Sequence, residues 1–222
     1  MPASSASAAE PAHARSTLKD QNRRALIGLL LVNLAVLVLL VQTGQLTAPD
    51  VDALVKHWRT LLPAGIGVAL AGVVNGLLGA DTKARLVYWR WSNPLPGCRA
   101  FSRYAERDAR IDMDALPRVL GRWPVEPRQQ NATWYRLYKS VEREPAVMDA
   151  HRLFLLTRDY TAIAFLMLVV ASPLALWLLP SALTTAAYTG LLLLQYLLAR
   201  KAASTYGVRF VTSVLAIKAV EK

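Results

Sequence analysis

The sequence predicts an all-α membrane protein with four transmembrane helices, two on either side of a small, mostly helical cytoplasmic segment. Three observations support this prediction. Of the 222 residues, 54% are hydrophobic and only 18% are charged, a composition more apolar than that of a typical soluble domain. Four apolar segments contain no Asp, Glu, Lys, Arg or His. The Lys and Arg residues gather in alternate connections between these segments, as they do in multi-pass membrane proteins.

The predicted membrane helices cover residues 25–43, 61–80, 160–179 and 184–199. About 20 apolar residues cross the roughly 30 Å of hydrocarbon in a bilayer. The fourth segment is the shortest, and its neighbours 180–183 can extend it. The first segment follows two arginines, as the core of a signal peptide does, but it is longer than such a core and no small-x-small cleavage site follows it. We therefore expect the first helix to be retained.

The basic residues predict the orientation of these helices. The connection 44–60 holds two Lys or Arg and the turn 180–183 holds none, whereas segment 81–159 holds fifteen. The N-terminal arm, 1–24, which is predicted to be disordered, holds four, and the C-terminal tail, 200–222, holds five. Lys and Arg collect on the cytoplasmic side, so both termini and the central segment are expected in the cytoplasm. This topology accounts for most of the net charge of +11 without a nucleic-acid partner.

The cytoplasmic subdomain is expected to cover 81–145, and it is too short for a robust core of its own. If 100–110 is helical, four of its arginines recur on one face at steps of four, four and three residues. Guanidinium groups on one face could bind a phosphate-bearing ligand; the alternative is a solvated face beside anionic lipid. The arginines considered as ligand-binding residues are Arg90, Arg99, Arg103, Arg107 and Arg110.

A second helix is expected over 127–143, where Pro127 suits the first turn. Its apolar side consists of Trp134, Leu137, Tyr138 and Val141. At its start, Gln130 and Asn131 could read a base edge, although amides at a helix start are commonly capping groups. Nearby, Asp112 is expected to cap a short helix rather than to bind magnesium.

From Ala146 the helical pattern continues into the third membrane helix, which gives a rod of about 34 residues and about 50 Å. His151 lies on the cytoplasmic part of this rod and is expected to be packed or solvated. One cysteine and three widely separated histidines make a metal site improbable, and no cofactor is expected. The sequence shows no nucleophile or acid–base arrangement, so we expect a protein that is not an enzyme.

The second membrane helix carries small residues at intervals of four and three: Gly65, Ala69, Gly72, Gly76 and Gly79. Such a stripe lets another helix backbone approach closely. Asn75 flanks the stripe, and the first and fourth helices contribute Asn33 and Gln195. Amides within a membrane usually face the protein interior, either as hydrogen bonds between helices or as the lining of a pore.

Three segments, 91–101, 110–112 and 130–135, together resemble a signature of an uncharacterised group of bacterial inner-membrane proteins. They read WSNPLPGCRAF, RID and QNATWY. The 2+2 architecture is similar to that of compact membrane effectors of bacterial anti-phage signalling systems, in which a cytoplasmic nucleotide opens a membrane lesion. This resemblance implies an inner-membrane location, antiviral defence and an anionic nucleotide or oligonucleotide ligand. It transfers no residue roles.

The leading hypothesis is an oligomeric membrane effector, similar to a channel, whose arginine-rich segment binds an anionic ligand and controls permeability. Its expected partners are the lipid bilayer, further copies of the chain and the ligand itself. One alternative is a membrane-anchored scaffold that recruits a cytoplasmic protein. Another is an enzyme that acts on lipid headgroups. Depolarisation of cells on expression would distinguish the first hypothesis from the scaffold.

Overall fold

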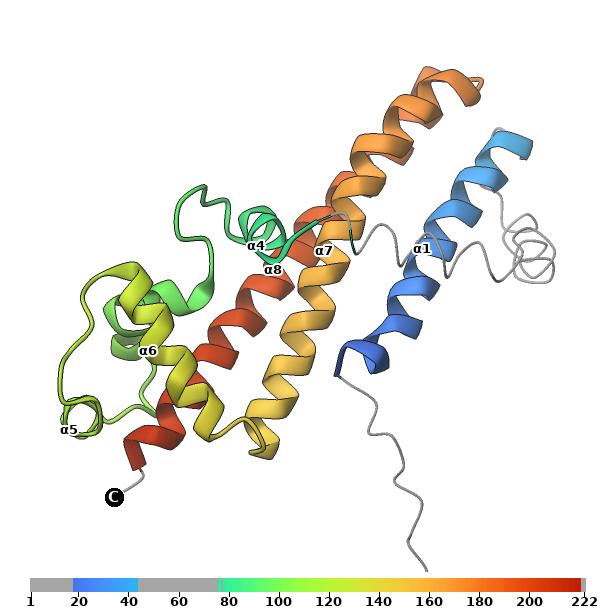
Figure 1. Cartoon of the computed structure of the whole chain (residues 1–222). Coiled ribbons are helices and arrows are strands. Elements are labelled where there is room, and N and C mark those ends of the chain that lie inside the picture. Colours follow the sequence, from blue (N-terminus) through green and yellow to red (C-terminus); the bar gives the residue numbers. More distant parts are fainter. Residues whose placement is uncertain (1–17, 44–75, 77, 221–222) are drawn as a thin grey trace, which may run out of the picture.

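The computed structural model describes residues 18–43, 76 and 78–220, and every regular element among them is helical (Figure 1). The predicted all-α class is therefore confirmed. The elements are α1 (Leu18–Thr43), α4 (Ala80–Tyr88), the short turns η1 (Pro96–Arg99), η2 (Ala100–Tyr104) and η3 (Ala105–Arg107), α5 (Leu116–Leu120), α6 (Pro127–Ser140), α7 (Pro145–Leu178) and α8 (Ala182–Val220).

Within the described residues, three helices, α1, α7 and α8, are long and apolar enough to cross a membrane. They correspond to three of the four predicted membrane helices. The other predicted helix, 61–80, lies almost entirely outside the described residues, and its last residue, Ala80, begins α4. The described part of the chain therefore supports a membrane-embedded protein with three candidate spans.

The two longest helices, α7 and α8, pack side by side as an antiparallel pair (Figure 1). Pro145 lies in the first turn of α7, where the missing N–H costs nothing. Beyond residue 199, where the sequence predicted a tail of undetermined secondary structure, residues 200–220 continue α8. The continuation contains no proline, and residues 210–215 are all buried, so this part of α8 is covered on every side.

Helix α1 lies beside the apolar half of α7 (Figure 1). It begins at Leu18, so residues 18–24 are helical and do not belong to an extended arm, whereas 1–17 lie outside the described residues. Near its start, the Asn22 side chain donates a hydrogen bond to the Arg152 carbonyl at 2.9 Å. Near its end, Leu37 and Leu40 pack in a cluster with Leu179. The starts of α1 and α7 therefore lie at one end of the bundle, together with the end of α8.

A second hydrophobic cluster lies at that end, where α5, α6 and the turns 100–107 cover the C-terminal half of α8. The predicted apolar side of α6 forms part of it: Trp134 and Val141 are buried, and Leu137 and Tyr138 pack against the cluster. Phe210 of α8 makes edge-to-face contacts with Trp134 and Tyr138. The 81–145 segment thus takes much of its core from α8.

Helix α4 is short, and it is held against both long helices. Ala84, Val87 and Tyr88 on its buried side pack with Ala203 of α8. This contact places the chain that leaves α4 beside α8, at the point where α8 changes from an apolar to a polar sequence.

Candidate anion-binding site

The arginine-rich segment does not form the single helix that was expected over 100–110. Its turns are 3₁₀-helical at 96–99, π-helical at 100–104 and 3₁₀-helical at 105–107. The backbone leaves the helix at Asp108, with φ −110° and ψ 107°. Arg110 therefore lies beyond the helical turns, and the prediction that it shares their face is wrong.

Arg110 is instead held by neighbouring side chains. Its Nε and Nη2 donate to the two Asp108 carboxylate oxygens at 2.9 and 2.7 Å, and Nη2 also donates to the Thr212 hydroxyl at 3.0 Å. These hydrogen bonds hold the pKa of Asp108 well below its usual range. The same hydrogen bonds engage Nε and Nη2 of Arg110, which were predicted to bind a ligand.

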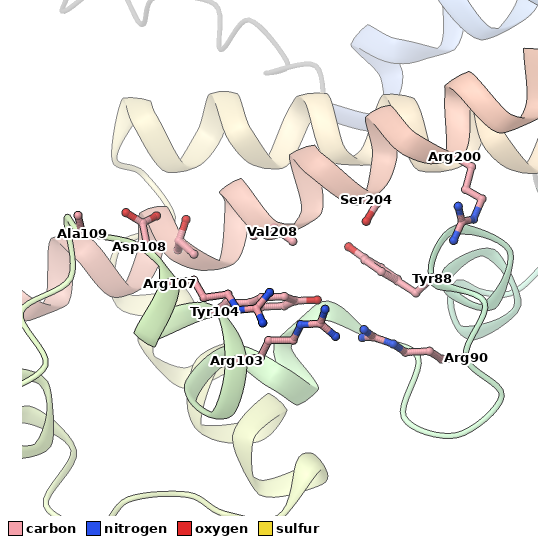
Figure 2. A pocket seen from close by; sticks show the side chains of 11 residues that line it. Tyr88, Arg90, Arg103, Tyr104, Arg107, Asp108, Ala109, Arg200, Ser204 and Val208 are labelled. Carbon is pink, nitrogen blue, oxygen red and sulfur yellow. The ribbon is translucent and has the colours of Figure 1, made fainter.

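A pocket of about 460 Å³ opens between α4, the turns 100–107 and α8 (Figure 2). We call it the anion pocket. Its lining residues are Tyr88, Arg90, Arg103, Tyr104, Arg107, Asp108, Ala109, Arg200, Ser204, Val208 and Thr212. The volume lies within the range of pockets that hold small molecules.

The anion pocket is strongly cationic. Its four arginines are Arg90, Arg103, Arg107 and Arg200, and none forms an ion pair within the part of the chain that the structure describes. Asp108 is the one acidic residue in the lining, and Arg110 already neutralises it. In Figure 2 the Arg90 and Arg103 guanidinium groups point toward each other. An anion between such groups would be stabilised by charge-assisted hydrogen bonds.

Three buried donor groups in this lining have no hydrogen-bond partner in the part of the chain that the structure describes: the Tyr88 hydroxyl, Nη1 of Arg90 and Nε of Arg200. A buried donor left without an acceptor costs about 1–3 kcal/mol. The Arg90 and Arg200 donors can bind an anion in the pocket, whereas the Tyr88 hydroxyl lies against Gly207 of α8. This is the strongest sign that the pocket takes a ligand with several acceptor oxygens.

Trp89 forms a platform beneath Arg200. It adopts a left-handed conformation at the end of α4, with φ 52° and ψ 45°, which is uncommon for a large side chain. Its indole N–H donates to the Tyr196 hydroxyl at 2.9 Å, and that hydroxyl donates to the Leu86 carbonyl at 3.0 Å. The Arg200 guanidinium carbon lies 3.6 Å from the centre of the indole ring, a cation–π contact that orients the arginine.

Of the predicted ligand-binding residues, Arg90, Arg103 and Arg107 line the pocket. Arg99 lies close to them without lining it, and burial, followed by the charge of Arg90, lowers its pKa. Its Nη1 donates to the Asn93 carbonyl at 3.3 Å.

The structure gives Gln130 and Asn131 roles in packing. Gln130 is 1% exposed, and its Oε1 accepts hydrogen bonds from the backbone N–H groups of Phe101 and Ser102 at 3.2 and 3.1 Å. Its amide donates to the Val125 carbonyl at 2.8 Å. The Asn131 side chain lies against Gly97, where a Cβ would collide with it. These contacts do not place either residue in the anion pocket.

The α8 side of the pocket was missed by the sequence reasoning. Arg200, Ser204, Val208 and Thr212 recur every four residues along α8, so they share one face of the helix. The pattern is present in the sequence, but it has meaning only if the helix continues past residue 199. Tyr88 and Tyr104 also line the pocket. Tertiary contacts set their position relative to this face of α8, so sequence spacing does not identify them.

The amides Asn33 and Gln195, predicted in the first and fourth membrane helices, line one groove of about 480 Å³ between α1, α7 and α8. The Gln195 amide donates to the Tyr160 hydroxyl, which also lines the groove. Asn33 donates to the Leu29 carbonyl of its own helix at 2.8 Å. Gln195 therefore links two helices, whereas Asn33 satisfies its amide locally.

Only two members of the predicted small-residue stripe are described, Gly76 and Gly79. A Cβ built at either position meets no atom within 4 Å, so neither makes a close helix contact within the described chain. The remaining predicted packing or pore residues of this segment, Gly65, Ala69, Gly72 and Asn75, lie outside the described residues.

No protein-family model matches the chain, and no curated protein or solved structure shows significant similarity to it. The functional argument therefore depends on the geometry of the anion pocket and on its position beside the apolar helices.

Proposed function

We propose that the protein is a membrane effector that binds a phosphate-bearing ligand in the anion pocket and changes membrane permeability in response. The proposal combines a receptor site at one end of the bundle with apolar helices at the other. It includes assembly of several copies in the bacterial inner membrane, with the anion pocket facing the cytoplasm. No catalytic step is part of it.

The observation that carries the proposal is the charge balance of the anion pocket. Four arginines line it without ion pairs in the described structure, and its single carboxylate is neutralised by Arg110. Arg90 and Arg200 are half-buried, whereas Arg103 and Arg107 are exposed, and an anion bound among the four would offset their mutual repulsion. A phosphate-bearing ligand supplies that anion, and its several oxygens suit the planar guanidinium donors.

Helix α8 supports the link between ligand and membrane. Residues 182–199 of α8 form an apolar segment without charged residues, and the pocket residues follow directly at Arg200. The helix contains no proline, so a displacement at Arg200 can move the apolar segment without a hinge between them. Exposed apolar side chains near the turn between α7 and α8, such as Trp177 and Leu183, are suited to contact lipid or another copy of the chain.

The proposal is tested with the full chain reconstituted into dye-loaded liposomes. A panel of nucleoside mono-, di- and triphosphates and short oligonucleotides is added to the outside, and dye release is followed. Active compounds should release dye from wild-type liposomes, whereas the double variant Arg103→Glu/Arg107→Glu should not respond. Arg136→Glu, at an exposed position on α6 outside the pocket, is the matched control.

Two outcomes would count against the effector function. Binding of a panel compound without dye release would favour the scaffold, in which the pocket recruits a partner but does not open the membrane. If no compound binds or releases dye, the anion pocket is not a receptor for phosphate-bearing ligands of this class. Depolarisation of cells that express the wild type, but not the double variant, would support the effector function in vivo.

A further inference from the structure

The two ends of the anion pocket differ in position and chemistry. Tyr88, Arg90 and Arg200 lie at the end nearer the apolar half of α8, which we call the proximal end. Arg107 lies toward the other end, which we call the distal end (Figure 2). Thr212 also belongs to this end, because it lies 12 residues beyond Arg200 on α8. Along α8 the positions 200 and 212 are separated by about 18 Å. The pocket is therefore long enough for its two ends to bind different parts of one ligand.

The proximal end lies at the depth expected for lipid headgroups. Arg200 is the first charged residue after the 18 uncharged residues 182–199. On the facing segment, Trp89 and Trp91 flank Arg90 and are 60% and 84% exposed. Exposed tryptophans beside arginines at the end of an apolar helix are typical of the membrane–water interface.

The unpaired donors are concentrated at this end. The Tyr88 hydroxyl, Arg90 Nη1 and Arg200 Nε are buried without acceptors among the described residues, whereas Arg107 at the distal end is exposed to solvent and Thr212 accepts a hydrogen bond from Arg110. Trp89 holds Arg200 in place by the stacking contact of 3.6 Å. The site is therefore organised before a ligand arrives, which reduces the entropy cost of binding.

We propose that the proximal end is a phosphate subsite, in which Arg90 and Arg200 donate hydrogen bonds to one phosphate group at headgroup depth. A phosphate offers three strong acceptor oxygens, enough for both donors. The inference depends on the proposed function, because it specifies where in the same pocket the phosphate binds. The remaining volume, toward Tyr104 and Arg107, holds the group to which the phosphate is esterified.

The phosphate can reach this subsite from two sources with the same chemistry. A phospholipid headgroup would enter from the bilayer, and a soluble nucleotide would enter from the cytoplasm. The full chain is placed in nanodiscs of phosphatidylcholine and titrated with the nucleotide that gives the strongest binding. In a second arm, detergent-solubilised protein is titrated with fluorescent phosphatidic acid, and the nucleotide is then added as a competitor.

Each arm compares Arg90→Gln and Arg200→Gln with the distal variant Arg107→Gln and with the exposed control Arg136→Gln. Each proximal variant should weaken binding by about ten- to a hundredfold, as the loss of a charge-assisted hydrogen bond does. Arg200→Lys keeps the charge but lacks the Nε donor, so it should also weaken binding. Unchanged melting temperatures identify variants that remain folded, and the Lys variant serves if Arg200→Gln is unstable.

The outcomes separate the two proposals. If nucleotide binding in nanodiscs depends on Arg90 and Arg200, the phosphate comes from a soluble nucleotide. If only the binding of phosphatidic acid depends on these two arginines, the phosphate comes from a lipid headgroup. If Arg107→Gln abolishes binding while both proximal Gln variants bind as the wild type does, the subsite is wrong and the proposed function remains. If no probe binds the wild type in either arm, both proposals are overturned.

Discussion

Lys83 of α4 and Asp159 of α7 form a buried ion pair, with 3.1 Å between Nζ and Oδ1. Their side chains are only 5% and 4% exposed. The same carboxylate oxygen accepts hydrogen bonds from Nε and Nη2 of Arg158 at 3.1 and 2.9 Å. One carboxylate thus serves two cations at the point where the uncharged segment of α7 begins, and it fixes α4 against the bundle.

Replacing this carboxylate should destabilise the protein strongly. In Asp159→Asn two cations lose their counter-charge in a buried site, and removal of one partner from such a pair typically costs about 3–5 kcal/mol. The apparent melting temperature of the protein in detergent measures the effect. Glu142→Gln, which removes the exposed ion pair with Lys139, is the control and should leave the melting temperature unchanged. Equal melting temperatures for both variants would show that the buried pair contributes little.

A methyl group at Gly207 should displace Tyr88. A Cβ at this position would collide with the Tyr88 hydroxyl and would lie 2.9 Å from a ring carbon of Phe154. Overpacking of this kind costs about 1–3 kcal/mol, so Gly207→Ala should lower the melting temperature. Gly190→Ala on the same helix meets no atom within 4 Å and is the matched control.

The cause can be separated by a double-mutant cycle. Tyr88→Phe removes the nearest colliding atom, so the cost of Gly207→Ala should be smaller in the Tyr88→Phe background than in the wild type. If Gly207→Ala lowers the stability equally in both backgrounds, the added methyl group collides mainly with Phe154 instead.

Gln130 should prove to be a structural residue. Gln130→Leu leaves the buried N–H of Phe101 and the N–H of Ser102 without their acceptor, and each unsatisfied group costs about 1–3 kcal/mol. The melting temperature should therefore fall. Gln129→Leu, at the exposed neighbouring position, should have little effect. A Gln130→Leu protein that remains as stable as the wild type but loses ligand binding would restore Gln130 as a ligand residue.

Protonation of His151 should destabilise the fold at acidic pH. His151 lies outside the uncharged segment of α7, stacked on Phe210 with ring centres 4.5 Å apart, and it shares a hydrogen bond with the Tyr138 hydroxyl at 3.2 Å. Burial, and then the charge of Arg158, lower its pKa to about 4, below the value of about 6.5 for an unfolded histidine.

Because the unfolded chain binds more protons in this window, the stabilisation is complete above about pH 6.5 and is lost as the pH falls toward 4. Melting temperatures measured across this range should fall for the wild type. His151→Phe keeps an aromatic ring against Phe210 but does not titrate, so its melting temperature should depend less on pH. Identical pH dependence of the two proteins would assign the effect to other groups.

The arrangement of the helices predicts which chain positions share a side of the membrane. Reporter fusions at Gly97 and after Lys222 should both report the cytoplasm, because the turns 96–107 and the end of α8 lie at the same end of the bundle. A reporter inserted at Pro180, in the turn between α7 and α8, should report the opposite side. Opposite reports from the first two positions would contradict this topology.

Local sequence signals were sufficient to predict the long helices. Apolar composition and the absence of charge located α1, α7 and the first half of α8, and the spacing of Trp134, Leu137, Tyr138 and Val141 identified the buried side of α6. Asp112 accepts the backbone N–H groups of Asp114 and Ala115 at 2.8 and 3.0 Å in the turn before α5, but the N-cap of α5 is Ala115 without a side-chain cap, so the expected cap on this helix is not formed. These features depend on residues that are close together in the sequence.

The pocket depends on contacts between distant residues, which periodicity does not reveal. The regular spacing of the arginines predicted that Arg110 lies on the ligand-binding face. The helical turns instead end at Asp108, whose carboxylate forms an ion pair with the Arg110 guanidinium. Arg200 was interpreted only as a basic residue beside the membrane. Its place in the pocket requires both the continuation of α8 and the packing of α4 against it.

Helices α7 and α8 each contribute residues to two hydrophobic clusters, and this affects how the protein can unfold. Both helices contribute to the cluster around Phe210 and to the one around Leu192. The two clusters therefore share α7 and α8, and the bundle and the pocket-bearing end should melt as one cooperative unit. A fragment limited to 80–145 would lack Phe210, Val211 and Val214 and would expose the surface that covers them. The pocket-bearing end is thus not expected to fold on its own.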